Sequence, residues 1–127
     1  MSIDHTANAK RWALLSRLLK RTQAGKLKWN PLGDSDSKFL TAVSDYTITI
    51  DQDDDREPME GSVRIVVRNY SDRVVEQFDE YDVEAPEGTS SEPASRLFSA
   101  LFDAARRQAF DSDAAISDLL KQLGDDD

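Results

Sequence analysis

Apolar residues recur at helical spacing between residues 10 and 24. At 100° per residue, the five large apolar side chains of this stretch fall within an arc of about 160°, the width of a helix face that packs on a core. These side chains are Trp12, Leu14, Leu15, Leu18 and Leu19. Arg11 falls inside the same arc, so we expect its stem to lie on apolar surface and its guanidinium to reach solvent. Gly25 can adopt the left-handed conformation that ends a helix.

A period of two follows the helix and predicts strands. Polar and apolar residues alternate in four runs, and turn-forming residues separate the runs. The four runs are residues 26–29, 39–50, 62–70 and 73–78. Links this short join antiparallel neighbours, so we expect a meander with one buried face. By strand parity, Ile48 and Ile65 belong to the buried face.

Helical spacing returns after a flexible crossing loop at residues 84–92. Ser90 or Ser91 can cap a helix that runs to about residue 109, whose apolar arc is about 200° wide. A last helix follows residues 111–113, which can cap it, and carries a narrower apolar stripe. The stripe consists of Ile116, Leu119, Leu120 and Leu123. This helix can cover its own core or a dimer interface, and we expect the former because terminal amphipathic helices usually dock within their own chain.

These elements predict an α+β fold. We expect a four-stranded antiparallel meander with the N-terminal helix and the two C-terminal helices packed on one face. A chain of 127 residues is long enough for one domain with a real core, so residues 1–127 form a single domain. Residues 1–5 and 124–127 are expected to be frayed tails.

Charge is unevenly distributed along this acidic chain. The formal net charge is −9, yet residues 1–30 carry seven basic residues and one acidic residue. Such segregation often indicates an interaction surface. The basic side of the first helix consists of Lys10, Arg17, Lys20 and Arg21. Burying five large apolar residues at roughly 1.5–3 kcal/mol each outweighs roughly 1 kcal/mol per cation at a charged surface, so the apolar side packs inward and the basic side stays free.

A second basic surface is expected on the outward face of the sheet. If the apolar series faces the helices, strand parity turns four cations and two hydroxyls the other way. These residues are Lys26, Lys28, Thr47, Thr49, Arg64 and Arg68. They would form a partner-binding platform, although a polar outer face is also what an ordinary antiparallel sheet exposes to water. No aromatic residue lies among the six, which disfavours single-stranded nucleic acid, where stacking carries much of the affinity.

Catalytic and cofactor-binding patterns are missing from the sequence. His5 is the only histidine and lies in the expected tail, and there is no cysteine, so hydrolytic triads and zinc sites have no members. Glycine-rich phosphate loops are absent, and we expect no cofactor. Asp51, Asp53 and Asp55 match the start of a calcium loop, but Arg56 stands where glycine is needed, so we expect no metal site.

The sequence also bears on location. Arg17 interrupts the only early apolar run, so we expect neither a signal peptide nor a membrane span. The absence of cysteine is typical of a cytoplasmic protein. We therefore expect a cytoplasmic protein with no membrane partner.

One resemblance accompanies these patterns. With the segment GKLKW after a leucine-rich helix, an alternating strand pair, and ARRQA before a short amphipathic helix, the chain resembles small uncharacterised bacterial proteins of α-β-α plan. The resemblance implies the fold in outline and a bacterial origin. It implies no activity and no site residue.

These observations favour a non-enzymatic protein-interaction module, as an accessory, regulatory or inhibitor subunit. Its partner would be another protein, or a second copy of the chain in a homodimer. Two alternatives remain open. The basic first helix and cationic sheet face could engage nucleic acid. The acidic majority could instead mimic nucleic acid and block a DNA-binding enzyme.

Overall fold

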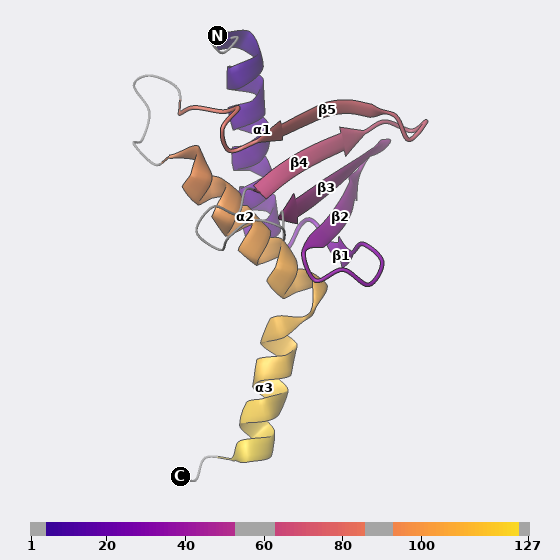
Figure 1. Ribbon diagram of the computed structural model, residues 1–127. Helices are drawn as coiled ribbons and strands as arrows, with labels where there is room; N and C mark the ends of the chain where they lie inside the picture. Colours follow the sequence, from indigo (N-terminus) through magenta and orange to yellow (C-terminus); the bar gives the residue numbers. More distant parts are fainter. Residues whose placement is uncertain (1–4, 53–62, 86–92, 125–127) are drawn as a thin grey trace.

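The computed structural model describes residues 5–52, 63–85 and 93–124, and for His5 the backbone alone. Three helices and five strands follow one another in this part of the chain (Figure 1). The elements are α1 (His5–Gln23), β1 (Asn30–Pro31), β2 (Lys38–Val43), β3 (Tyr46–Gln52), β4 (Val63–Arg68), β5 (Val74–Asp79), α2 (Ala94–Ala109) and α3 (Ser112–Leu123). The predicted α+β class, with one helix before an antiparallel sheet and two helices after it, is confirmed.

The sheet has five strands in the order β1-β2-β3-β4-β5, where we predicted four. The predicted strand at residues 39–50 is a hairpin, because Ser44 adopts a left-handed conformation (φ 56°) and Val43 pairs with Tyr46 across the turn. The predicted strand at residues 26–29 is also wrong. That segment is irregular, and the two-residue β1 pairs with β2 immediately after it.

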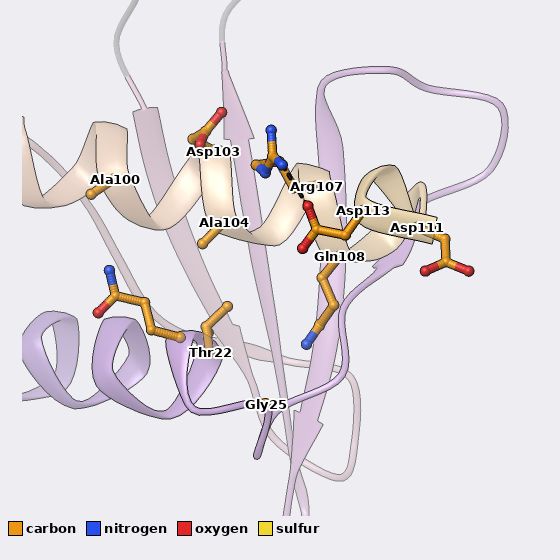
Figure 2. Close-up of a pocket in the computed structure, with 10 residues that line it drawn as sticks. Thr22, Gly25, Ala100, Asp103, Ala104, Arg107, Gln108, Asp111 and Asp113 are labelled. Carbon is orange, nitrogen blue, oxygen red and sulfur yellow. Dashed lines mark hydrogen bonds and ion pairs between the residues drawn. The ribbon is translucent and has the colours of Figure 1, made fainter. Parts of the chain in front are cut away.

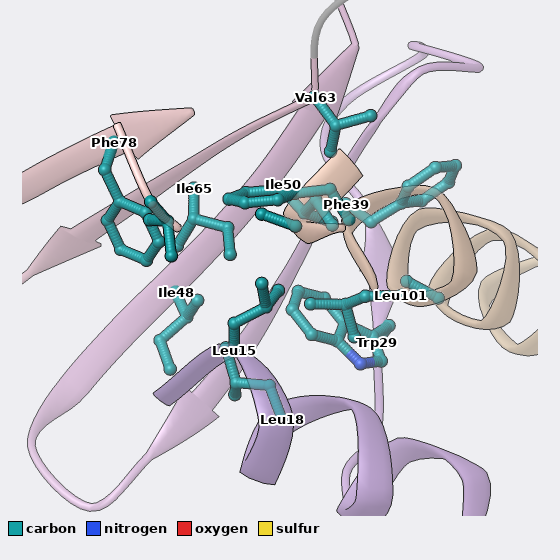
Figure 3. Packing of buried hydrophobic residues seen from close by; sticks show 14 residues of the cluster. Leu15, Leu18, Trp29, Phe39, Ile48, Ile50, Val63, Ile65, Phe78 and Leu101 are labelled. Atoms are coloured by element: carbon teal, nitrogen blue, oxygen red, sulfur yellow. The ribbon is translucent and has the colours of Figure 1, made fainter. Parts of the chain in front are cut away.

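Strand parity is as predicted. Ile48 and Ile65 are buried on the inner face of the sheet. One row of register partners runs across four strands there, from β2 to β5. The row consists of Phe39, Ile50, Ile65 and Phe78, and each of these side chains is almost fully buried (Figure 3). Because each strand places every second side chain on this side, the row sets the surface that the helices must cover.

Helices α1 and α2 lie side by side over the inner face. Leu15 and Leu18 of α1, with Phe98 and Leu101 of α2, complete the buried cluster. Edge-to-face packing of Phe78 on Phe98, with ring centroids 5.8 Å apart, joins the far strand to α2. Helix α3 has no buried residue and, among the described elements, packs only on α2. Our prediction that α3 docks on the sheet with the other helices is therefore wrong.

Arg11 does not extend into solvent as we expected. Its Nε and Nη2 donate hydrogen bonds to the two carboxylate oxygens of Glu76, at 3.1 and 3.2 Å, and its guanidinium lies 5.5 Å from the centre of the Phe78 ring. This two-pronged pair joins α1 to the edge strand β5. The bond from Arg11 is the main reason that the pKa of Glu76 lies below its usual value.

Several expectations fall on chain ends and loops. Residues 1–4 and 125–127 of the expected tails lie outside the described residues, but α1 begins as early as His5. Asp53, Asp55, Ser90 and Ser91 also lie outside the described residues. The residue that precedes α2 is Pro93, which provides no side-chain cap. Asp111 precedes α3 in a left-handed conformation (φ 54°) and likewise forms no side-chain cap bond.

The Arg11–Glu76 pair predicts how stability depends on pH. A carboxyl group whose pKa is lowered by folding stabilises the fold above its unfolded pKa, and this contribution disappears as the pH falls through the folded pKa. Glu76→Gln should therefore lower the free energy of unfolding by about 0.5–1 kcal/mol at neutral pH, and by less as the pH falls towards about 3. Urea unfolding followed by tryptophan fluorescence across this pH range measures the difference.

The matched control is the same substitution in an Arg11→Met background. There the pH-dependent difference should shrink, because Glu76 has lost the donor that lowers its pKa most. An equal pH-dependent difference in both backgrounds would contradict this assignment.

Candidate interaction surfaces

Two open hollows adjoin each other where α1 and α2 end. One, of about 450 Å³, lies between the last turn of α1 and the last turns of α2, and Figure 2 shows the residues that line it. The other, of about 720 Å³, follows residues 25–30 towards the end of α2. Their shared lining residues are Gly25, Gln108 and Asp111.

Bonds within the protein occupy the central polar groups of these hollows. Gln108 receives a hydrogen bond from the backbone N–H of Trp29 at 2.7 Å and donates one to the carbonyl of Leu27 at 2.6 Å. Thr22 receives the indole N–H of Trp29 at 2.9 Å and donates to the carbonyl of Leu18. Gln108 and Thr22 therefore hold the segment between α1 and β1 in place. No sequence pattern predicts the bonds of Gln108, because they join residues that only the fold brings together.

The cations on the outward face of the sheet are engaged by acids. Arg64 pairs with Asp51 of the neighbouring strand at 3.2 Å, and Arg68 lies 3.9 Å from Asp72. Register partners Lys38, Asp51, Arg64 and Asp79 form a row of alternating charge across β2 to β5. Parity placed the two arginines on the expected face, but Asp51 on the neighbouring strand and Asp72 in the turn between β4 and β5 reduce the positive charge that they present.

The remaining members of the predicted platform are not available on that face. Thr49 is buried, with 5% of its surface exposed, and Thr47 is partly buried. Lys26 and Lys28 lie in the irregular segment between α1 and β1, so they do not belong to the sheet at all. The six residues therefore do not come together as one surface.

The four cations on the basic side of α1 differ from the sheet arginines in both exposure and pairing. Lys10, Arg17, Lys20 and Arg21 are all exposed, and within the described chain none of them has an ion pair. Helix α1 contains no acidic residue that could pair with them one turn away. Lys26 and Lys28, also exposed, continue the positive charge beyond the end of the helix. We call these six residues, Lys10, Arg17, Lys20, Arg21, Lys26 and Lys28, the basic surface.

The apolar stripe of α3 is uncovered. Ile116, Leu119, Leu120 and Leu123 expose between 47% and 74% of their surface. Figure 1 shows why: the chain turns at the junction after α2, and α3 projects away from the sheet. Large apolar side chains gathered on one exposed face are typical of an interaction site. We call these four residues the α3 stripe.

One acidic residue outside these surfaces, Glu80, has a raised pKa. Burial raises the pKa of Glu80, and a hydrogen bond from the backbone N–H of Val63 partly opposes this shift. Among the described residues, no group of three or more histidine, cysteine or acidic side chains could hold a metal ion. Of the three aspartates that match the start of a calcium loop, the described one, Asp51, forms an ion pair with Arg64. In the same part of the chain, no helix is long and apolar enough to cross a membrane.

Comparisons with known proteins add no assignment. No protein-family model, curated protein or solved structure matches this chain. The resemblance to small bacterial proteins therefore stays a prediction.

The Gln108 clamp predicts a structural effect. Gln108→Leu should lower the free energy of unfolding by about 2–4 kcal/mol, because the N–H of Trp29 and the carbonyl of Leu27 both lose their partner. Urea unfolding measures the change. Gln23→Leu is the matched control, since Gln23 lines the same hollow and is exposed, and its effect should stay within about 0.5 kcal/mol. Equal losses in both variants would refute the clamp.

Proposed function

We propose that this protein is a non-enzymatic interaction module that binds another protein through the α3 stripe. The single observation that carries the proposal is the exposure of four large apolar side chains on one side of a helix that buries none of its residues. Leaving such side chains in water forfeits roughly 1.5–3 kcal/mol for each one that a partner could bury. An amphipathic helix that presents anchors at positions i, i+3, i+4 and i+7 matches the helix-in-groove mode of recognition.

The polar hollows between α1 and α2 support a binding role rather than a reaction. Thr22 and Gln108 are bonded to backbone and indole groups of the protein itself, so they are not free to orient a substrate. Arg107, at the rim, is bonded to Asp113 at 2.6 Å. The bond between Arg107 and Asp113 spans the junction from which α3 projects.

A second candidate function rests on the basic surface. Four exposed cations on one helix and two more after it, with no ion pair among the described residues, suit an anionic partner such as a nucleic acid. Screening over about 8 Å in physiological salt keeps distant acids from cancelling a local patch. For the alternative of an acidic nucleic-acid mimic, pairing with arginines reduces the negative charge that three described acids present, namely Asp51, Glu76 and Asp113.

The α3 stripe predicts which residues a partner needs. The tagged full chain should capture a partner from a lysate of its source organism, and Leu119→Gln with Leu120→Gln should lose that partner. Two buried leucines contribute about 3 kcal/mol or more, so affinity should fall by over about a hundredfold. Quantitative mass spectrometry of the captured proteins measures the loss. Lys121→Gln, on the opposite side of α3, is the matched control, and loss of the partner there as well would contradict the proposal.

The basic surface predicts a different pair of variants. If it engages nucleic acid, a fluorescent 20-base-pair duplex should bind more weakly as salt rises, with a slope of about 0.9 per phosphate contact in a logarithmic plot. Arg17→Glu with Arg21→Glu should abolish most of this binding, whereas Arg64→Glu with Arg68→Glu should reduce it little, since those arginines are already paired. Fluorescence anisotropy measures both. Equal losses of affinity in the two double variants would show that the sheet arginines contribute to binding as much as those of α1. If the wild type does not bind the duplex, the nucleic-acid function is wrong.

A further inference from the structure

The α3 stripe has a spacing that reads the same in both directions. Its members, Ile116, Leu119, Leu120 and Leu123, are separated by three, one and three residues. A two-fold axis that passes between Leu119 and Leu120, perpendicular to the helix, lays Ile116 beside Leu123 of a second helix running the opposite way. Contacts related by such an axis are identical on both copies, so one stripe can serve as its own complement.

We propose that a second copy of this chain covers the α3 stripe, with the two α3 helices antiparallel. The inference rests on the proposed function, because it names the partner of the same surface. Each copy buries its four anchors against the four of the other, in the manner of a short coiled-coil contact.

The charges of α3 suit this pairing. On a helical wheel, Asp118 and Lys121 lie on the side opposite the stripe, and the bordering residues Ala115, Ser117 and Gln122 are uncharged. Asp113 also borders the stripe, beside Leu120, and it bonds Arg107 at 2.6 Å, which offsets its charge. Within α3, the one charged side chain that borders the stripe is therefore paired inside its own copy.

The placement of α3 favours the antiparallel arrangement over the parallel one. Helix α3 projects from the rest of the protein and, among the described elements, packs only on α2 (Figure 1). Its 12 residues span about 18 Å. An antiparallel pair puts the two bodies, each in a chain with a formal charge of −9, at opposite ends of this length. A parallel pair would bring both bodies to the same end.

The size of the contact sets the strength of the complex. Four anchors on a three-turn helix cover less than the roughly 800 Å² per partner of a standard stable interface. The dimer should therefore be weak and concentration-dependent, with a dissociation constant in roughly the micromolar range. A second copy is also enough to give a short, unsupported helix the tertiary packing that helices of about 12 residues need in water.

Sedimentation of the full chain at rising concentration tests the dimer. From about 1 to 500 μM, the weight-average mass should rise from the protomer's 14.3 kDa towards twice that value. Leu119→Glu should keep the chain at the protomer mass. Ala114→Glu adds the same charge on the far side of α3 and should leave the mass increase unchanged.

Cross-linking tests the direction of the helices. The chain has no cysteine, so introduced thiols are the only ones present. A mixture of Ile116→Cys and Leu123→Cys chains should form disulfide dimers on mild oxidation, whereas either variant alone should form few. In the antiparallel pair, two copies of one position lie about 10 Å apart along the axis, beyond the reach of a disulfide.

Three outcomes would overturn the inference. These are a protomer mass at every concentration, a mass increase that Leu119→Glu leaves intact, and disulfide formation by Ile116→Cys alone as readily as in the mixture. If the chain stays monomeric while Leu119→Gln with Leu120→Gln still loses a captured protein of another sequence, the dimer is wrong and the proposed function stands. If neither loss nor dimer is observed, both are wrong.

Discussion

The single apolar face of the sheet is the constraint on which the rest of this structure depends. Four of the five antiparallel strands place Phe39, Ile50, Ile65 and Phe78 in one row on that face. At roughly 1.5–3 kcal/mol for each large side chain, leaving the row in water would forfeit most of the net stability of a domain this size. Helices α1 and α2 cover it together and pack against each other. These two helices bury the row, and among the described elements α3 packs on α2 alone.

The two covering helices are also held by side-chain amides in a reciprocal way. Asn8 of α1 exchanges two hydrogen bonds with the backbone of Glu84, at 3.0 and 2.7 Å, in the segment that leads towards α2. Gln108 of α2 does the same for Trp29 and Leu27, in the segment that follows α1. Asn8 of α1 thus holds the connection that leads into α2, and Gln108 of α2 holds the connection that leaves α1. These bonds satisfy backbone groups at places where no strand partner is available.

The sequence predicted the features that depend on local periodicity. Strand parity identified Ile48 and Ile65 as buried, and the helical wheel identified the apolar side of α1, because both follow from backbone geometry alone. It did not reveal the turn at Ser44, where a left-handed residue other than glycine interrupts a continuous β-like pattern. Residues 26–29 alternate between polar and apolar as in a strand. Trp29 is buried, however, because it packs against α1, where its indole N–H bonds Thr22. Four residues are too few to separate these causes.

The candidate sites were harder to predict because charge and exposure depend on neighbours that lie far away in the sequence. Parity placed Arg64 on the outer face, but only the register of β3 and β4 puts Asp51 beside it. The same limit applies to α3, since an amphipathic pattern shows that a helix has an apolar side and leaves open what covers it. A helix of about 12 residues gains little stability from its own hydrogen bonds, because nucleation offsets most of what propagation contributes. Packing on α2 and the bond between Arg107 and Asp113 support this helix within the chain. If a partner buries the α3 stripe as proposed, folding of α3 and binding at the stripe become one coupled equilibrium.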